Sequence, residues 1–175
     1  MSTQHNSSAA RWTGLLSLGA VSALVLAPVQ ASAAPAELET IAGAQGIGED
    51  TLDASVEVNE VSRDSTSEFV TLVYTIEYQG SDDLYLGNVT DNRDYGRHAQ
   101  AGTALADSTG QERYYPLANE DEKCLCTIRS GSSIIDRLGP DESVTYWAMY
   151  MVPEDVDAVD VEVPEFGELA DLSLD

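Results

Sequence analysis

The chain has very little positive charge. Its 175 residues include 8 Lys and Arg against 31 Asp and Glu, and its only lysine is Lys123. The formal net charge of −23 repels phosphate groups. No basic stripe with interleaved aromatic residues is present to overcome that repulsion locally. Nucleic acid and anionic lipid surfaces are therefore not expected as partners.

The chain also lacks a long uninterrupted apolar run. The most apolar stretch, residues 15–29, is broken by Gly19 and Pro28 and is too short for a membrane span. It follows a polar start and ends at Ala31-Ser32-Ala33, the small-x-small pattern that signal peptidase accepts. The pattern predicts a cleaved signal peptide over residues 1–33 and a secreted or cell-wall-associated protein. An uncleaved anchor is the alternative.

Histidine is equally scarce, because His98 is the only histidine after the predicted cleavage site. It lies in a polar stretch, and the chain contains no Gly-x-Ser-x-Gly turn for a serine nucleophile. Paired carboxylates cannot be singled out among so many acids. We therefore expect a protein that is not an enzyme, with no catalytic residues and no cofactor.

The predicted mature part, residues 34–175, has seven basic residues against 31 acidic ones, a net charge of −24. Its length suits one domain with a real core. The lysine depletion favours an exposed acidic surface suited to salty surroundings, where screening relieves repulsion between carboxylates. The alternative is calcium binding at Ser81-Asp82-Asp83, at residues 91–94 or at Asp155-Val156-Asp157, although none of these has EF-hand spacing.

Alternation of apolar and polar residues predicts an all-β protein. The period of two is clearest over residues 52–58, 70–78, 144–152 and 159–163, with shorter strands at 84–89 and 124–128. The turn residues 107–110 predict a hairpin between 103–106 and 113–117. Residues 34–50 have little periodic apolar content and predict a flexible leader. Over residues 144–152 both faces are apolar, so we expect a central strand there.

Seven to nine short strands about ten residues apart, without a long amphipathic helix, favour an immunoglobulin-like antiparallel β-sandwich over residues 51–175. Two sheets can hide their apolar faces against each other, whereas one open sheet would leave them in water. A small closed barrel is the alternative.

Cys124-Leu125-Cys126 is the motif with the most specific chemistry. It contains both cysteines of the chain, and an exported protein would encounter an oxidising environment. In a flat strand the two Cα atoms would lie about 6.5 to 7 Å apart, so a disulfide needs a local bend. A structural bridge is the leading interpretation. The alternatives are a redox-active dithiol and a soft-metal site for copper(I) or zinc.

Four segments together resemble a family of exported actinobacterial proteins: Tyr114-Tyr115-Pro116-Leu117, Cys124-Leu125-Cys126-Thr127, the turn 138–143 and Val152-Pro153. In longer members of that group the domain precedes a peptidoglycan-binding domain like that of outer membrane protein A. The turn, strand and Val-Pro ending are also distantly similar to the telokin-like immunoglobulin fold of secreted mycobacterial immunoprotective antigens. The likeness spans roughly residues 68–166, and Asp141 stands where glycine is usual.

The resemblance implies an immunoglobulin-like fold without known catalysis, and it transfers no active-site residue. We therefore expect a non-enzymatic binding or structural module with an unknown extracellular or cell-wall partner. The expected contact surfaces are the loops at 91–102 and 119–123, because a rigid sandwich presents its loops at the ends. Thiol redox or copper handling through Cys124 and Cys126, and calcium-dependent adhesion, are the alternative functions.

Overall fold

A computed structural model describes residues 38–65, 67–86, 102–120, 124–127 and 137–174. The predicted signal peptide lies outside these ranges. The chain from residue 37 onward forms one compact unit. Within the described ranges no helix has the length and apolarity that a membrane span requires. The strands are β1 (Ala42–Gln45), β2 (Ala54–Arg63), β3 (Phe69–Tyr78), β4 (Leu84–Tyr85), β5 (Ala104–Asp107), β6 (Arg113–Tyr114), β7 (Arg137–Leu138), β8 (Ser143–Met151), β9 (Ala158–Glu162) and β10 (Leu169–Ser173).

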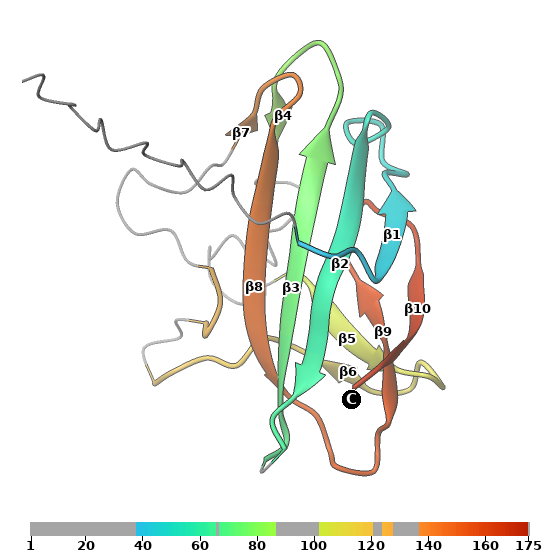
Figure 1. Cartoon of the computed structure of the whole chain (residues 1–175), viewed down its shortest axis with the longest axis vertical. Coiled ribbons are helices and arrows are strands. Elements are labelled where there is room, and N and C mark those ends of the chain that lie inside the picture. Colours follow the sequence, from blue (N-terminus) through green and yellow to red (C-terminus); the bar gives the residue numbers. More distant parts are fainter. Residues whose placement is uncertain (1–37, 66, 87–101, 121–123, 128–136, 175) are drawn as a thin grey trace, which may run out of the picture. The chain divides into compact units, whose positions relative to one another are not determined.

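The strands form two four-stranded antiparallel sheets, ordered β1-β2-β3-β8 and β10-β9-β5-β6, and a small β4-β7 pair. Figure 1 shows the first sheet across the view, with β5 and β6 behind it. The all-β prediction is thereby confirmed, and the arrangement is consistent with a β-sandwich. The described residues hold ten strands instead of seven to nine. The sequence did not predict β1, β7 and β10, and the strand predicted over 124–128 is absent from the described residues.

The core is formed by the apolar residues that alternate with polar ones along the strands, as the sequence pattern predicted. Alternate residues of β2, β3 and β8 are nearly inaccessible to solvent, and β5 and β9 supply the facing layer. These core residues include Val56, Val58, Leu72, Tyr74, Ile76, Leu105, Tyr146, Ala148, Tyr150, Val159 and Val161. Apolar burial of this kind contributes about 25 cal/mol per Å² and is the main force joining the layers.

Strand β1 lies inside the segment that the sequence predicted to be a flexible leader, so that prediction was wrong for residues 42–45. Its residues pair with β2, with Ala42 opposite Val58 and Ala44 opposite Val56. Ala42 and Ala44 also pack against the core. Small side chains give a weak apolar signal, and the pairing depends on a partner strand that local sequence does not show.

Strand β10 was not predicted from the sequence, because a β-bulge interrupts the alternation of apolar and polar residues along it. The register against β9 shifts between Leu169 and Leu172. The extra residues include Asp171, which has a φ of 58° and whose N–H donates to Asp160 Oδ1 at 2.8 Å. Leu169 and Leu172 are three positions apart, which does not fit the period of two of a regular strand. The sequence pattern therefore did not indicate a strand here.

The β5–β6 hairpin forms where the turn residues predicted it. Gly110 has a φ of 65°, and its N–H donates to the carbonyl of Asp107 at 2.8 Å. The Asp107 carboxylate accepts hydrogen bonds from the hydroxyl of Thr109 and from the N–H groups of Gln111 and Glu112. These donors, Thr109 first among them, hold the pKa of Asp107 below its ordinary value.

Candidate functional site

The Cys-Leu-Cys segment runs beside β8 at the edge of the first sheet. Cys126 forms a bridge pair with Ala148, and the N–H of Met149 donates to the carbonyl of Leu125 at 2.9 Å. The N–H of Thr127 donates to the carbonyl of Trp147 at 2.8 Å. The sequence predicted a short strand over 124–128, and the structure shows isolated bridges here instead. These bonds occupy the backbone groups on the outer edge of β8.

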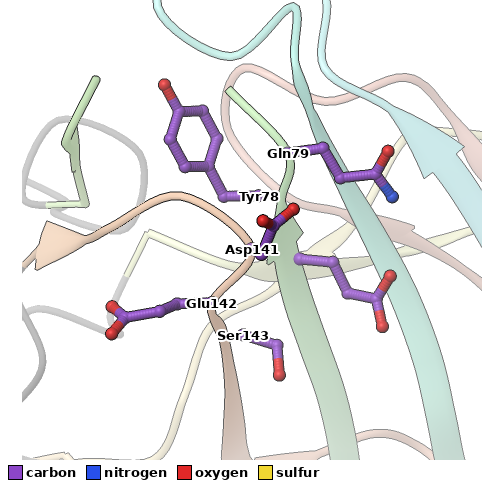
Figure 2. A pocket seen from close by; sticks show the side chains of 6 residues that line it. Tyr78, Gln79, Asp141, Glu142 and Ser143 are labelled. Atoms are coloured by element: carbon purple, nitrogen blue, oxygen red, sulfur yellow. The ribbon is translucent and has the colours of Figure 1, made fainter. Parts of the chain in front are cut away.

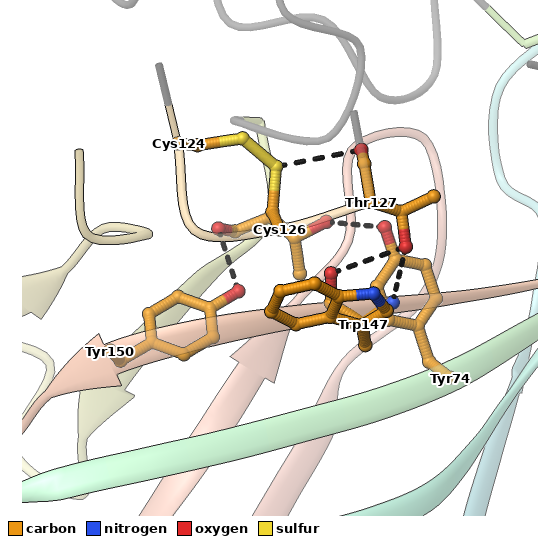
Figure 3. Close-up of a disulfide and its surroundings, with 7 residues drawn as sticks. Tyr74, Cys124, Cys126, Thr127, Trp147 and Tyr150 are labelled. Carbon is orange, nitrogen blue, oxygen red and sulfur yellow. Dashed lines mark hydrogen bonds between the residues drawn. A yellow bond between two sulfur atoms is a disulfide. The ribbon is translucent and has the colours of Figure 1, made fainter. Parts of the chain in front are cut away.

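A disulfide joins Cys124 and Cys126. Their Cα atoms are 5.3 Å apart, closer than in a flat strand, so the local bend that the bridge needs is present. Cys124 is 5% exposed and Cys126 is 3% exposed, and Figure 3 shows the bridge beside Thr127 and β8. Exchange requires a thiolate to reach a sulfur atom, so this burial favours a structural bridge over a redox centre.

A buried polar network lies near the disulfide in the core (Figure 3). The hydroxyls of Tyr74 and Thr103 are 3.0 Å apart, and the hydroxyl of Tyr150 donates to the carbonyl of Thr103 at 3.2 Å. Burial raises the pKa of both tyrosine hydroxyls, so they stay neutral. The network satisfies polar groups that would otherwise be costly to bury and fixes the start of β5 against β3 and β8.

Strand β8 is the last strand of its sheet, not a central one as predicted from its two apolar faces. Its outward residues pair with those of β3: Met151 with Phe69, Met149 with Thr71 and Trp147 with Val73. The second apolar row therefore points to solvent. Phe69, Trp147 and Met151 are 41%, 43% and 48% exposed.

Leu125 extends this row beyond β8. The buried pair Cys126–Ala148 places Leu125 opposite Met149 on the outward face, and Leu125 is 44% exposed. We call the resulting surface the apolar patch, defined as Phe69, Val73, Leu125, Trp147, Met149 and Met151. Exposed apolar surface of this continuity is uncommon on soluble proteins unless it contacts a partner.

The border of the apolar patch is acidic. Glu60 lies opposite Val73 on the outward face of β2, and Glu68 immediately precedes Phe69. Further along the same face lie Glu57 and Glu77. No lysine or arginine in the described residues of β2, β3 or β8 balances these charges on the outward face.

The three arginines of the described ranges are engaged elsewhere. The guanidinium of Arg63 donates to the carbonyls of Val152, Pro153 and Val156 at 2.7, 3.1 and 2.7 Å, which holds the β8–β9 connection. Arg113 pairs with Glu162, and Arg137 pairs with Asp83. None of these cations neutralises the border of the patch.

A separate pocket of about 200 Å³ lies where β3 ends and β8 begins. Figure 2 shows Tyr78, Gln79, Asp141, Glu142 and Ser143 around it. The Glu142 carboxylate accepts the N–H of Gly139 at 2.8 Å, which closes the turn before β8. In the view of Figure 2 the side chains of Glu142 and Gln79 point in opposite directions, so they do not converge on one point.

Several predicted site residues lie outside the described ranges. These are His98, nearly all of the 91–102 loop and residues 121–123 of the second expected contact loop. Of the calcium candidates, Ser81-Asp82-Asp83 and Asp155-Val156-Asp157 are described. No group of three or more His, Cys, Asp or Glu side chains is arranged to hold a metal ion within the described ranges.

No protein-family model matches the chain, and no curated protein matches it. Among solved structures, the chain is similar to a functionally unknown protein from Listeria monocytogenes EGD-e. The similarity covers 79% of this chain and 89% of that protein, at 9% identity and a TM-score of 0.43. No inference about function follows from a similarity this weak.

The apolar patch is the site that sequence reasoning missed. Its signal was visible as Trp147, Met149 and Met151 alternating with the core residues of the same strand. That pattern has two explanations, burial on both faces or exposure of one apolar face, and only the position of β8 in the sheet distinguishes them.

Proposed function

We propose that the chain is an exported, non-enzymatic β-sandwich that acts in the cell wall or the medium as a binding module. The observation that carries the proposal is the apolar patch, on whose outward face Glu57, Glu60 and Glu77 also lie. Solvating such a patch is unfavourable at roughly 25 cal/mol per Å², and contact with a partner removes that cost. The patch extends across two strands and the Cys-Leu-Cys segment, so rigid backbone holds it in place.

An immunoglobulin-like topology is part of the proposal. The chain passes from β3 in the first sheet to β5 and β6 in the second, returns to β8 and ends in β9 and β10 of the second sheet. Crossing between two antiparallel sheets in this manner is typical of Greek-key sandwiches. Such a scaffold serves recognition because its faces stay rigid while its loops vary.

Export supports an extracellular role. The signal-peptide pattern of residues 1–33 and the two cysteines, which pair with each other, both suit an oxidising compartment. The high negative charge suits a protein that stays soluble outside the cell.

The test is fractionation of the producing cells followed by a binding assay. We expect the mature protein, starting at Ala34, in the medium or wall fraction, and saturable binding to isolated extracellular material. Recovery of the uncleaved chain from the cytoplasm would refute the proposal. So would turnover of ester, peptide or glycan substrates that is lost in His98→Ala.

A further inference from the structure

The edge of β8 next to the apolar patch cannot accept an added strand over residues 147–149. The carbonyl of Trp147 accepts from Thr127, the carbonyl of Met149 accepts from Leu117 at 2.8 Å, and the N–H of Met149 donates to Leu125. With these backbone groups occupied, a partner at the patch must be recognised through side chains. The relevant chemistry is therefore that of the outward face.

That chemistry is apolar in the centre and anionic at the border. Trp147, Met149 and Met151 supply large side chains that adapt to an irregular partner surface. Glu60 lies on the outward face across Val73 from Trp147, and Glu68 precedes Phe69, the partner of Met151. The outward face of the described sheet has no basic residue. A surface of this kind is complementary to apolar side chains flanked by cations.

We propose that the apolar patch binds an amphipathic segment of another protein whose apolar side chains are flanked by Lys or Arg. This assignment rests on the proposed function and specifies its partner class. A second copy of the chain is a poorer occupant, because each copy carries a net charge of −23 and would bring its own acidic border against the other. An anionic membrane meets the same repulsion.

The test uses the secreted mature chain, residues 34–175, in which Trp147 is the single tryptophan. The probe is a synthetic amphipathic peptide of Leu and Lys, and the matched peptide has Glu in place of every Lys. We expect the Leu–Lys peptide to bind and to shift the Trp147 emission to shorter wavelengths as the indole leaves water. We expect the Leu–Glu peptide to leave the emission unchanged.

Two matched variants separate recognition at the patch from general attraction to an acidic protein. Met151→Lys should weaken binding about tenfold or more. Leu52→Lys makes the same change at an exposed apolar residue outside the patch and should weaken it less than about threefold. Equal losses in the two variants, or binding without a change in Trp147 emission, would overturn the assignment.

Two further measurements distinguish the other occupants. Sedimentation that shows a dimer dissociated by Met151→Lys would assign the patch to a second copy and overturn the proposal. If Met151→Lys keeps full binding to isolated extracellular material, the patch assignment fails while the proposed function stands. If neither the parent chain nor the variant binds that material, the proposed function itself fails.

Discussion

At the scale of single residues, Asp141 is one of three residues other than glycine that have a positive φ in the described ranges. It has a φ of 59° in the turn Gly139-Pro140-Asp141-Glu142, where the N–H of Glu142 donates to the carbonyl of Gly139 at 3.2 Å. This is the left-handed region, which glycine enters at no steric cost. Aspartate holds this conformation at a steric cost that glycine would not have.

Asp141→Gly is expected to raise the free energy of unfolding by about 0.5 to 1 kcal/mol, because it relieves this strain. Urea unfolding measures the change. Asp141→Asn is the matched control, since asparagine also tolerates the left-handed region but removes the carboxylate near Glu77 and Glu142. If Asp141→Asn stabilises the protein as much as Asp141→Gly, charge repulsion and not backbone strain is the cause.

Asp107 makes the β5–β6 hairpin sensitive to acid. Its pKa is lowered in the folded state, so its contribution to stability is present above the unfolded pKa of about 3.9 and is lost as the pH falls through the folded pKa. Asp107→Asn should therefore be less stable than the parent at neutral pH, and the difference should shrink as the pH falls below the unfolded pKa and through the lowered folded pKa. Urea midpoints for both proteins across this range measure it.

Thr109→Val serves as the control for Asp107, because it removes the hydroxyl donor that lowers the pKa most. It should shrink the same pH dependence without removing the carboxylate. A gap between parent and Asp107→Asn that persists unchanged in acid would contradict the assignment.

At the scale of elements, Thr103 connects the start of β5 to tyrosines of β3 and β8. Thr103→Val keeps the shape but removes the hydroxyl 3.0 Å from that of Tyr74, and we expect a loss of about 1 to 2 kcal/mol in the free energy of unfolding. Thr103→Ser should retain most of the stability. In combination with Tyr74→Phe, the loss should be smaller than the sum of the single losses, because both members of one bond are then gone.

The disulfide is a local element, and its contribution should be correspondingly small. It closes a loop of three residues, so replacing both Cys124 and Cys126 by alanine should lower the free energy of unfolding by only about 1.5 kcal/mol. Reductant should bring the parent to the same level and add about two daltons to its mass. A loss above about 4 kcal/mol would mean that the bridge holds the whole segment against β8.

Strand β8 shows how one element serves two surfaces. Its inward residues Tyr146, Ala148 and Tyr150 are buried in the core, while the outward residues between them form most of the apolar patch. Substitutions on the outward face should therefore change binding more than stability. This separation makes Met151→Lys a usable probe, because Met151 is 48% exposed.

At the scale of the whole molecule, the dominant feature is a net charge of −23. Carboxylates crowded on one small domain repel one another, and salt near 1 M shortens the Debye length to about 3 Å. We expect molar sodium chloride to raise the melting temperature. Calcium chloride at matched ionic strength should add nothing further. Stabilisation by millimolar calcium beyond that of matched sodium chloride would instead indicate a specific ion site.

Much of the architecture follows from the sequence by itself. The alternation in residues 70–78 and 159–163 predicted β3 and β9, and the turn residues 107–110 predicted the hairpin, because both signals are local and arise from the pleat and from φ preferences. The charge that limits the choice of partners is likewise a property of composition alone. The bend that a bridge between Cys124 and Cys126 requires also followed from strand geometry.

Tertiary structure alone decided the rest. Residues 42–45 form a strand because they pair with the edge of β2. Strand β10 contains a bulge, so its apolar residues do not follow a period of two. Both faces of β8 are apolar in the sequence, but only its place at the end of a sheet decides that Trp147 and Met151 face solvent. Pairing partners and sheet order depend on contacts between distant residues, and a local pattern contains no information about which neighbour will cover a given face.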